Sequence, residues 1–150
     1  MKINLECGND IRNGYLNINS IEVNGATTCR FDSFNELVTE DLEEIVSNYT
    51  VHKCDPDKVF PTIQYWTNLL KPEGLLHISF IDIRRVGFLS YMPSCRIELL
   101  QTHQFIYGPN NDYKSIMDLN TMKTILNACN LKINIIDWDQ AVTCYVECQK

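Results

Sequence analysis

A nearly continuous apolar run, Leu75–Ile81, directly follows the turn sequence Lys71-Pro72-Glu73-Gly74, and no other segment limits the choice of fold as strongly. Proline and glycine in that turn predict the end of a helix. An apolar run with little alternation is typical of a strand that is covered on both faces. Because a helix that leads straight into a buried strand forms a parallel crossover, these segments predict an α/β fold.

The preceding helix is predicted to begin at Asp55-Pro56-Asp57 and to run to about Leu70. Aspartate accepts hydrogen bonds from unpaired first-turn amides, and proline needs no amide partner there. Apolar residues recur at helical spacing along this segment: Val59, Ile63, Trp66 and Leu70.

The residues before this helix predict short strands separated by turns. Strands are expected at Lys2–Leu5, Tyr15–Ile18, Thr27–Phe31 and Ile45–Val51, with a short helix or loop over Phe34–Glu44. Glycine-containing turns, such as Asn13-Gly14 and Asn24-Gly25, stand before the second and third of them.

The C-terminal part predicts a helix followed by a hairpin. The helix is capped by Asp118 or Asn120 and breaks at Asn130. Strands Leu131–Ile136 and Ala141–Val146 then alternate, and the link between them, Asp137 to Gln140, indicates an antiparallel edge of the sheet. The fold class expected is therefore a mostly parallel α/β sheet with an antiparallel C-terminal edge strand.

The length, net charge and hydropathy of the chain limit its number of domains, its partners and its location. With 150 residues the chain is expected to form a single domain, residues 1–150. Its net charge of −6 makes nucleic acid an unfavourable partner. No apolar run is long enough to span a membrane and no secretory signal is recognisable, so a cytoplasmic location is expected.

The seven cysteines are expected to be free and mostly buried, because their number is odd and nothing directs the chain to an oxidising compartment. No metal site is predicted. The three histidines, His52, His77 and His103, lie far apart in the sequence. No C-x-x-C pair occurs, and the closest cysteines, Cys144 and Cys148, are four apart within an apolar alternating run.

Three stretches, in this order, resemble motifs of one enzyme family. The first contains Leu5-Glu6-Cys7-Gly8 and then Gly14-Tyr15-Leu16-Asn17-Ile18-Asn19; the second is Trp66 to Leu76; the third is Ile106-Tyr107-Gly108 with Leu119 to Leu131. The first is similar to L-G-C-G followed by G-Y-x-N-x-D, the second to W-x-x-v-L-K-P-G-G-x-L, and the start of the third to I-y-G. These motifs belong to the small class I S-adenosylmethionine-dependent methyltransferases of bacteria and phages. The resemblance covers most of the chain and implies a Rossmann-like methyltransferase fold.

The resemblance also implies where a cofactor would bind. Ligands of open α/β sheets sit at the carboxyl ends of the strands, so the loop after the first strand is expected to meet S-adenosylmethionine. The residues that match cofactor-contacting positions are Cys7, Gly8, Asn19, Asp32, Asn48 and Tyr49. Each also has a simpler interpretation: Gly8 forms a turn, Asp32 caps a helix, and Tyr49 belongs to the core.

Two substitutions depart from the family pattern at this site. Glu6 stands where the family has the first glycine of its loop, and Asn19 stands in place of the acidic residue that grips the ribose. The Glu6 carboxylate is expected to face the carboxylate of the ligand; two like charges about 4 Å apart repel by about 4 kcal/mol at an effective dielectric constant of about 20. Asn19 offers one acceptor oxygen instead of two.

These departures lead to competing hypotheses of function. The favoured one is a degenerate, non-catalytic methyltransferase-like module that acts in interactions or structure, with a protein partner or a second copy, for example as a phage component within a virion. The alternative is an active methyltransferase on an unknown acceptor, with S-adenosylmethionine as cofactor. A third is a binder of another small molecule in the same crevice. The sequence leaves open whether the chain is an enzyme, and it identifies no catalytic residue.

Two further segments carry polar or aromatic groups. Asp82 with Arg84 and Arg85 follows the Leu75–Ile81 strand, and an exposed, solvated turn is favoured there over a general base beside an anion clamp. The segment Tyr107 to Tyr113 has the composition of a surface loop, either a substrate lid or a protein contact. Cys7 is expected to be a poor nucleophile, since Glu6 raises the pKa of its thiol.

Overall fold

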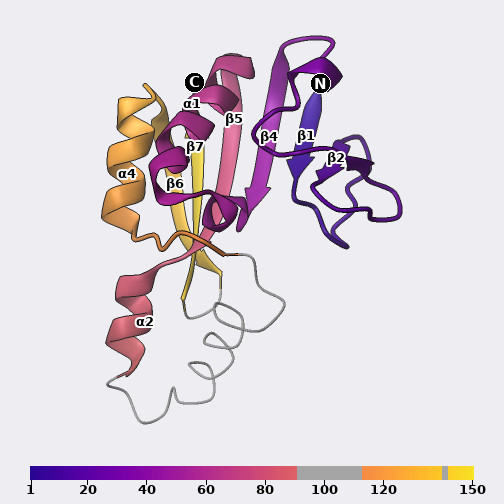
Figure 1. The fold of residues 1–150 in the computed structure, drawn as a ribbon. Coiled ribbons are helices and arrows are strands. Elements are labelled where there is room, and N and C mark those ends of the chain that lie inside the picture. Colours follow the sequence, from indigo (N-terminus) through magenta and orange to yellow (C-terminus); the bar gives the residue numbers. More distant parts are fainter. Residues whose placement is uncertain (91–112, 140–141) are drawn as a thin grey trace.

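One mixed sheet organises the molecule in the computed structural model, which describes residues 1–90, 113–139 and 142–150 (Figure 1). The strand order within these residues is β3-β2-β1-β4-β5-β7-β6. The strands are β1 (Lys2–Leu5), β2 (Leu16–Asn19), β3 (Thr27–Thr28), β4 (Leu42–Asn48), β5 (Leu70–Ile81), β6 (Lys132–Asp139) and β7 (Thr143–Gln149). The first five pair in parallel, whereas β7 pairs antiparallel with both β5 and β6. The expected fold class, mostly parallel with an antiparallel C-terminal edge, is confirmed.

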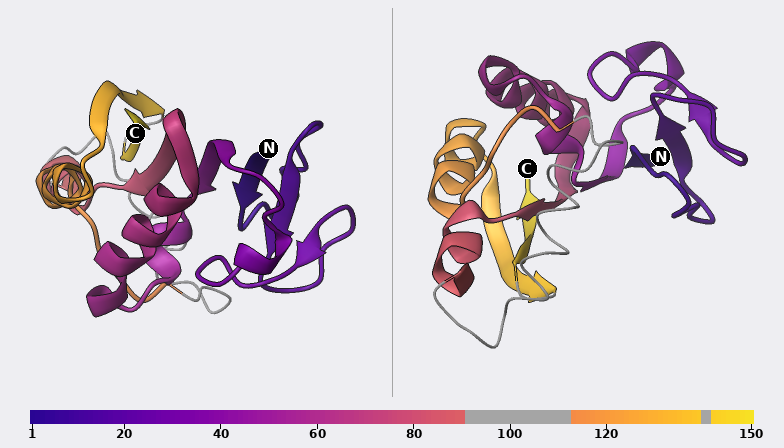
Figure 2. Two further views of the ribbon diagram at one scale, coloured as in Figure 1. Left: turned by 90° about the horizontal axis from the view of Figure 1, so that it is seen from above. Right: turned by 60° about the horizontal axis from the view of Figure 1, so that its bottom comes forward.

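The helices of the described residues comprise the α-helices α1 (Val59–Leu69), α2 (Ile83–Ser90) and α4 (Leu119–Ala128) and the short 3-10 helices η1 (Asn35–Leu37), η2 (Thr50–Lys53) and η3 (Pro56–Lys58). Figure 2 shows α1 and α4 against the same face of the sheet, with α2 beyond its lower end. Their apolar side chains and those of the strands form one main core, which includes Ile3, Phe80, Trp66 and Leu126.

The predicted helix before β5 is present, and its apolar positions are buried. Val59, Ile63 and Trp66 all pack in the core, and the Trp66 indole donates a hydrogen bond to the Phe31 carbonyl over 2.8 Å. The predicted capping contact is wrong, because the Asp55 side chain accepts no hydrogen bond from the first turn. Asp55 instead lies 3.3 Å from the ammonium group of Lys114.

The prediction that β5 is covered on both faces is also wrong for the part of the chain that the structure describes. Ile78 and Phe80 point into the core, whereas His77 and Ser79, which alternate with them, are only half-buried on the opposite face. That face, called the open face below, carries no helix within the described residues (Figure 2). Near β1 and β2 the loop after β1 covers it, and there Asn17 accepts a hydrogen bond from the Arg12 amide.

Several strand boundaries differ from the predicted ones. β3 ends at Thr28 instead of Phe31, because the chain turns at Arg30 and the Ser33 amide donates to the Arg30 carbonyl. β4 begins at Leu42, within the segment predicted to be a short helix or loop, and there Glu44 pairs with Lys2. It ends at Asn48 instead of the predicted Val51, because Tyr49 adopts a left-handed conformation, with φ 59°.

The strand β5 starts five residues before the predicted Leu75, directly at the end of α1. Gly74 lies in this early part, where a Cβ atom would be 2.9 Å from the Lys71 carbonyl oxygen and 3.0 Å from that of Leu42. Such a distance excludes any side chain without movement of the backbone, so the glycine that signals the helix end also permits this close strand contact.

The predicted C-terminal elements are largely confirmed. Asp118 caps α4 by accepting hydrogen bonds from the amides of Asn120 and Thr121, and Asn130 ends the segment with φ 58°. The two hairpin strands end three residues later than predicted, at Asp139 and Gln149. The six cysteines that the structure describes are free thiols, and five of them are buried. Within the described residues no helix has the length and apolar character needed to cross a membrane.

Candidate functional site

The carboxyl ends of the parallel strands meet at one edge of the sheet, where ligands of open α/β proteins bind. The chain segments that follow β1, β2, β4 and β5 at this edge begin at Glu6, Ser20, Tyr49 and Asp82. All residues predicted to contact a cofactor, except Asp32, lie in these segments or at the strand ends themselves. The ion pairs and hydrogen bonds between the segments determine what the edge can bind.

Glu6 joins three neighbouring strand ends through one carboxylate. Oε1 accepts hydrogen bonds from the Ser20 amide at 2.9 Å and from the Ser20 hydroxyl, and Oε2 lies 2.5 Å from Nζ of Lys53. Ser20 follows β2, Lys53 ends η2 beyond β4, and β1 lies between these two strands. The Glu6 side chain is 1% exposed, and its backbone is left-handed, with φ 49°. The carboxylate therefore crosses the end of β1, and Lys53 compensates its charge.

The neighbouring loop residues are engaged in contacts with each other. Asn19 is buried, its Oδ1 accepts from the Gly8 amide at 3.1 Å, and its Nδ2 donates to the Ile21 carbonyl at 3.0 Å. Gly8 has φ 50°, and an added Cβ atom would meet nothing within 4 Å. Burial raises the pKa of the Cys7 thiol, and Glu6 contributes less to the same direction. The acceptor at the predicted ribose-binding position thus already holds the Gly8 amide, and space remains beside Gly8.

Asp32 lies beyond the end of β3 and is paired with Arg30. It stands four residues beyond β3, and Arg30 donates to both of its oxygens at distances of 2.9 Å and 2.6 Å. This pairing lowers the pKa of Asp32. The expectation that Asp32 ends the third strand is wrong, because the turn at Arg30 ends that strand earlier.

Asn48 and Tyr49 lie at the end of β4, as predicted. The Tyr49 amide donates to the Ser79 carbonyl at 2.8 Å, and its hydroxyl is 3.2 Å from Oγ1 of Thr143 in β7. Asn48 lines a cavity on the open face. Of the six predicted residues, Cys7, Gly8 and Asn19 are adjacent in one loop and the neighbouring strand end, where Asn19 bonds to Gly8, whereas Tyr49 bonds toward β5 and β7.

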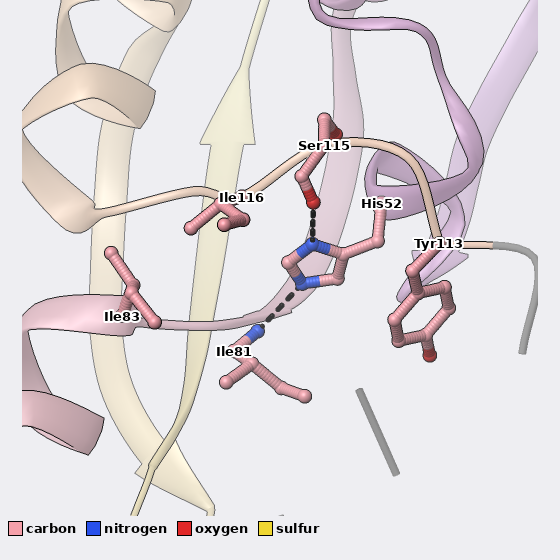
Figure 3. Close-up of a pocket in the computed structure, with 6 residues that line it drawn as sticks. All are labelled: His52, Ile81, Ile83, Tyr113, Ser115 and Ile116. Atoms are coloured by element: carbon pink, nitrogen blue, oxygen red, sulfur yellow. Dashed lines mark hydrogen bonds between the residues drawn. The ribbon is translucent and has the colours of Figure 1, made fainter. Parts of the chain in front are cut away.

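His52 is an important residue of this edge that the sequence did not reveal. It is 4% exposed, and Figure 3 shows its ring between two backbone groups. The Ile81 amide donates to Nε2 at 2.9 Å, so Nδ1 carries the proton that is donated to the Ser115 carbonyl, also at 2.9 Å. Burial lowers the pKa of this imidazole.

Since both ring nitrogens of His52 are used, the residue holds η2, β5 and the segment before α4 together and is not available as a general base. It lines a cavity of only about 10 Å³, which has room for about one water molecule (Figure 3). The only sequence signal for this role is a histidine placed directly after the apolar residue Val51.

Asp82 is buried, so the expected exposed turn is wrong. Its Oδ1 accepts from the amides of Arg84 and Arg85, and its Oδ2 accepts from the Leu119 amide at 3.1 Å. The carboxylate joins the starts of α2 and α4, because unpaired first-turn amides of both helices need acceptors. The general-base interpretation has no support here, as both oxygens are already engaged. The Ile106-Tyr107-Gly108 motif and most of the Tyr107 to Tyr113 loop lie outside the described residues.

At the positions that the family resemblance assigns to the cofactor, Asn19 is hydrogen-bonded to the backbone, and the Glu6 carboxylate bridges Ser20 and Lys53 across the strand ends. Within the described residues no group of three or more histidine, cysteine or acidic side chains is arranged to hold a metal ion.

Solved structures of methyltransferases share this fold. An S-adenosylmethionine-dependent methyltransferase from Archaeoglobus fulgidus matches with a TM-score of 0.69 and 12% identity, over 99% of this chain and 85% of its own. For a Burkholderia thailandensis 1,6-didemethyltoxoflavin-N1-methyltransferase the TM-score is 0.65 with 13% identity, over 99% and 70% of the two chains.

Another match is much longer than this chain. An O-methyltransferase family protein from Burkholderia thailandensis matches with a TM-score of 0.58 and 12% identity over 83% of this chain, which spans only 35% of that protein. No family model and no curated protein matches the sequence. At these identities the likeness concerns the architecture alone, and the chain has the Rossmann-like fold of the class I S-adenosylmethionine-dependent methyltransferases.

Proposed function

We propose that this chain is a methyltransferase-fold protein that does not transfer methyl groups and acts as an interaction or structural module. The observation that carries this proposal is the Glu6 carboxylate, which is bonded to Ser20 on one side and to Lys53 on the other. It occupies the ends of adjacent strands, and its side chain is 1% exposed. The expected charge repulsion becomes a minor argument, since Lys53 compensates the carboxylate, and obstruction becomes the main one.

The partner in this proposal is another protein or a second copy of the chain. Fold alone does not fix function, so a methyltransferase architecture is compatible with such a role. A cytoplasmic location, a phage origin and a place in a virion stay predictions.

The alternative is an active S-adenosylmethionine-dependent methyltransferase, and one observation favours it. The space beside Gly8 is open, with no atom within 4 Å of an added Cβ. Glycine at such a position lets a ligand approach the backbone closely. In this alternative Glu6 leaves Ser20 and Lys53 when the ligand binds.

Thermal unfolding with 1 mM S-adenosylmethionine or S-adenosylhomocysteine distinguishes the two. We expect the wild-type melting temperature to stay constant and that of Glu6→Gly to rise. A ligand at about 100 times its Kd stabilises by about 2.7 kcal/mol, which corresponds to roughly 5–10 °C for a domain of this size.

Lys53→Met is the matched control, because it breaks the ion pair and leaves the carboxylate across the strand ends. It should gain no binding. A ligand-induced rise in the wild type that Gly8→Trp abolishes would contradict the proposal and support the active enzyme. No rise in a folded Glu6→Gly variant would show that Glu6 is not what blocks the site.

A further inference from the structure

The open face holds a cavity of about 300 Å³ that is separate from the contacts of Glu6. Strands β4, β5 and β7 supply Glu44, Asn48, His77, Ser79 and Tyr145 to it, and Arg12 reaches it from the loop after β1. This volume is at the lower end of the range for small-molecule sites. Most of its lining side chains are polar, so a ligand there would be rich in hydrogen-bonding groups.

The charges around the cavity are compensated, with one exception. Oε2 of Glu44 lies 2.8 Å from the Lys2 ammonium, and Nε of Arg12 lies 3.0 Å from Oδ2 of Asp10. Glu147 does not itself line the cavity; it adjoins the lining through the His77 ring, 3.7 Å away, and its side chain is 19% exposed. Among residues 1–90, 113–139 and 142–150, no lysine or arginine pairs with Glu147.

His77 does not supply the missing charge at neutral pH. Its ring faces Glu44 on β4 at 3.3 Å and the Tyr145 hydroxyl on β7 at 2.5 Å, in addition to Glu147. Burial lowers the pKa of His77, against the two carboxylates, which raise it. The cluster therefore retains one negative charge that is largely removed from water, and a positive charge beside it would be stabilised.

Two hydrogen-bonding groups in the cavity also have no protein partner in the described part of the chain. The Asn48 amide and the Ser79 hydroxyl are neighbours in the strand register, and Tyr145 is the next residue in that row. The Tyr145 ring stacks on His77, with centroids 5.9 Å apart. An ammonium group has three donors for such acceptors, and aromatic rings attract cations.

We propose that this cavity binds a small organic cation, a primary ammonium group on a body that carries a hydroxyl or a similar hydrogen-bonding group. Glu147 and Glu44 provide the negative field, and Asn48 and Ser79 provide acceptors for the N–H groups. This inference goes beyond the proposed function and does not depend on whether a methyl donor binds at the other site. Protonation of His77 would compensate Glu147 instead, so affinity should fall as the pH falls from 8 to 5.

The test is a titration of the ¹⁵N-labelled protein, followed by NMR, with tyramine and with its neutral alcohol analogue, tyrosol. At pH 8 we expect tyramine to shift the amide signals of β4, β5 and β7, and tyrosol at equal concentration to leave them in place. Glu147→Gln should weaken tyramine binding at least about tenfold, since it removes the uncompensated charge.

Glu43→Gln is the control, because it removes the carboxylate next to Glu44 in β4, which is already paired with Lys71. It should bind tyramine as the wild type does. Absence of shifts with 20 mM tyramine, equal shifts with tyrosol, or unchanged affinity in a folded Glu147→Gln variant would each overturn the proposal.

Discussion

The two faces of the central sheet differ in composition, although the same strands form both. Toward α1 and α4, β5 presents Ile78 and Phe80, which are fully buried. Toward the open face it presents His77 and Ser79, and β4 and β7 add Glu44 and Glu147. Parallel sheets are usually covered on both faces and are then apolar throughout. Here the polar alternation shows that the open face is built for water or for a polar ligand.

This comparison also separates two kinds of polar site. At the carboxyl edge, Asn19 and His52 are bonded to backbone groups, and Glu6 is bonded to Ser20 and Lys53. On the open face, Asn48 and Ser79 line a cavity, and their side chains make no hydrogen bond within the described residues. Internally bonded groups stabilise the fold, whereas groups without partners are available to a ligand.

The largest expected effect distinguishes the two faces of β5. Phe80→Ala should lower the free energy of unfolding by about 3–5 kcal/mol, because it removes a fully buried ring and leaves a cavity. Ser79→Ala, one residue away on the open face, should change it by less than about 0.5 kcal/mol. Urea denaturation of the two variants measures both values. Similar losses in both would mean that the open face is also covered.

A smaller effect is expected on the pH dependence of stability, through His52 at the carboxyl edge. The pKa of His52 lies below its ordinary value of 6.5, so the unfolded chain binds the proton more readily than the folded one. The stability that the neutral ring provides is complete above about pH 6.5 and is lost as the pH falls toward the folded pKa. Urea unfolding between pH 8 and pH 5 should therefore show declining stability in the wild type.

His52→Ala tests whether His52 causes this decline in stability. At pH 8 it should cost about 1–3 kcal/mol, because the Ile81 amide and the Ser115 carbonyl lose their partner. Its stability should also depend less on pH, with His77, whose pKa is lowered too, responsible for the remaining slope. An unchanged slope would show that the pKa of His52 is the same in the folded and the unfolded chain.

The smallest expected effect concerns the N-terminal cap of α4. Asp118→Ala should destabilise the protein by about 1 kcal/mol, since Asp118 accepts hydrogen bonds from two amides in the first turn of α4. Asp137→Ala, in β6, is a control in which only a contact with the adjacent Trp138 amide is lost. Thermal unfolding measures both. An equal loss in the two variants would contradict the capping role.

Much of the fold follows from local patterns in the chain. The helix at Val59–Leu69, the cap at Asp118 and the antiparallel pair at the C-terminus were predictable because periodicity, capping and turn residues act over a few positions. The short β3 was not, because its end depends on Arg30 and Asp32 closing a turn. The helix α2 was not predicted either; its start is fixed by Asp82, a buried carboxylate that also binds the start of α4.

The candidate site was predictable only in part. The sequence alone determined that Glu6 and Asn19 stand where the similar family has a glycine and an acid, since this needs only the order of residues. Tertiary structure decided that Glu6 meets Lys53, 47 positions away, and that His52 bridges Ile81 and Ser115. It also decided that, among the described residues, no helix covers one face of the sheet. The physical reason is that a side chain's partners, and hence its charge state and availability, depend on which distant strands the fold brings beside it.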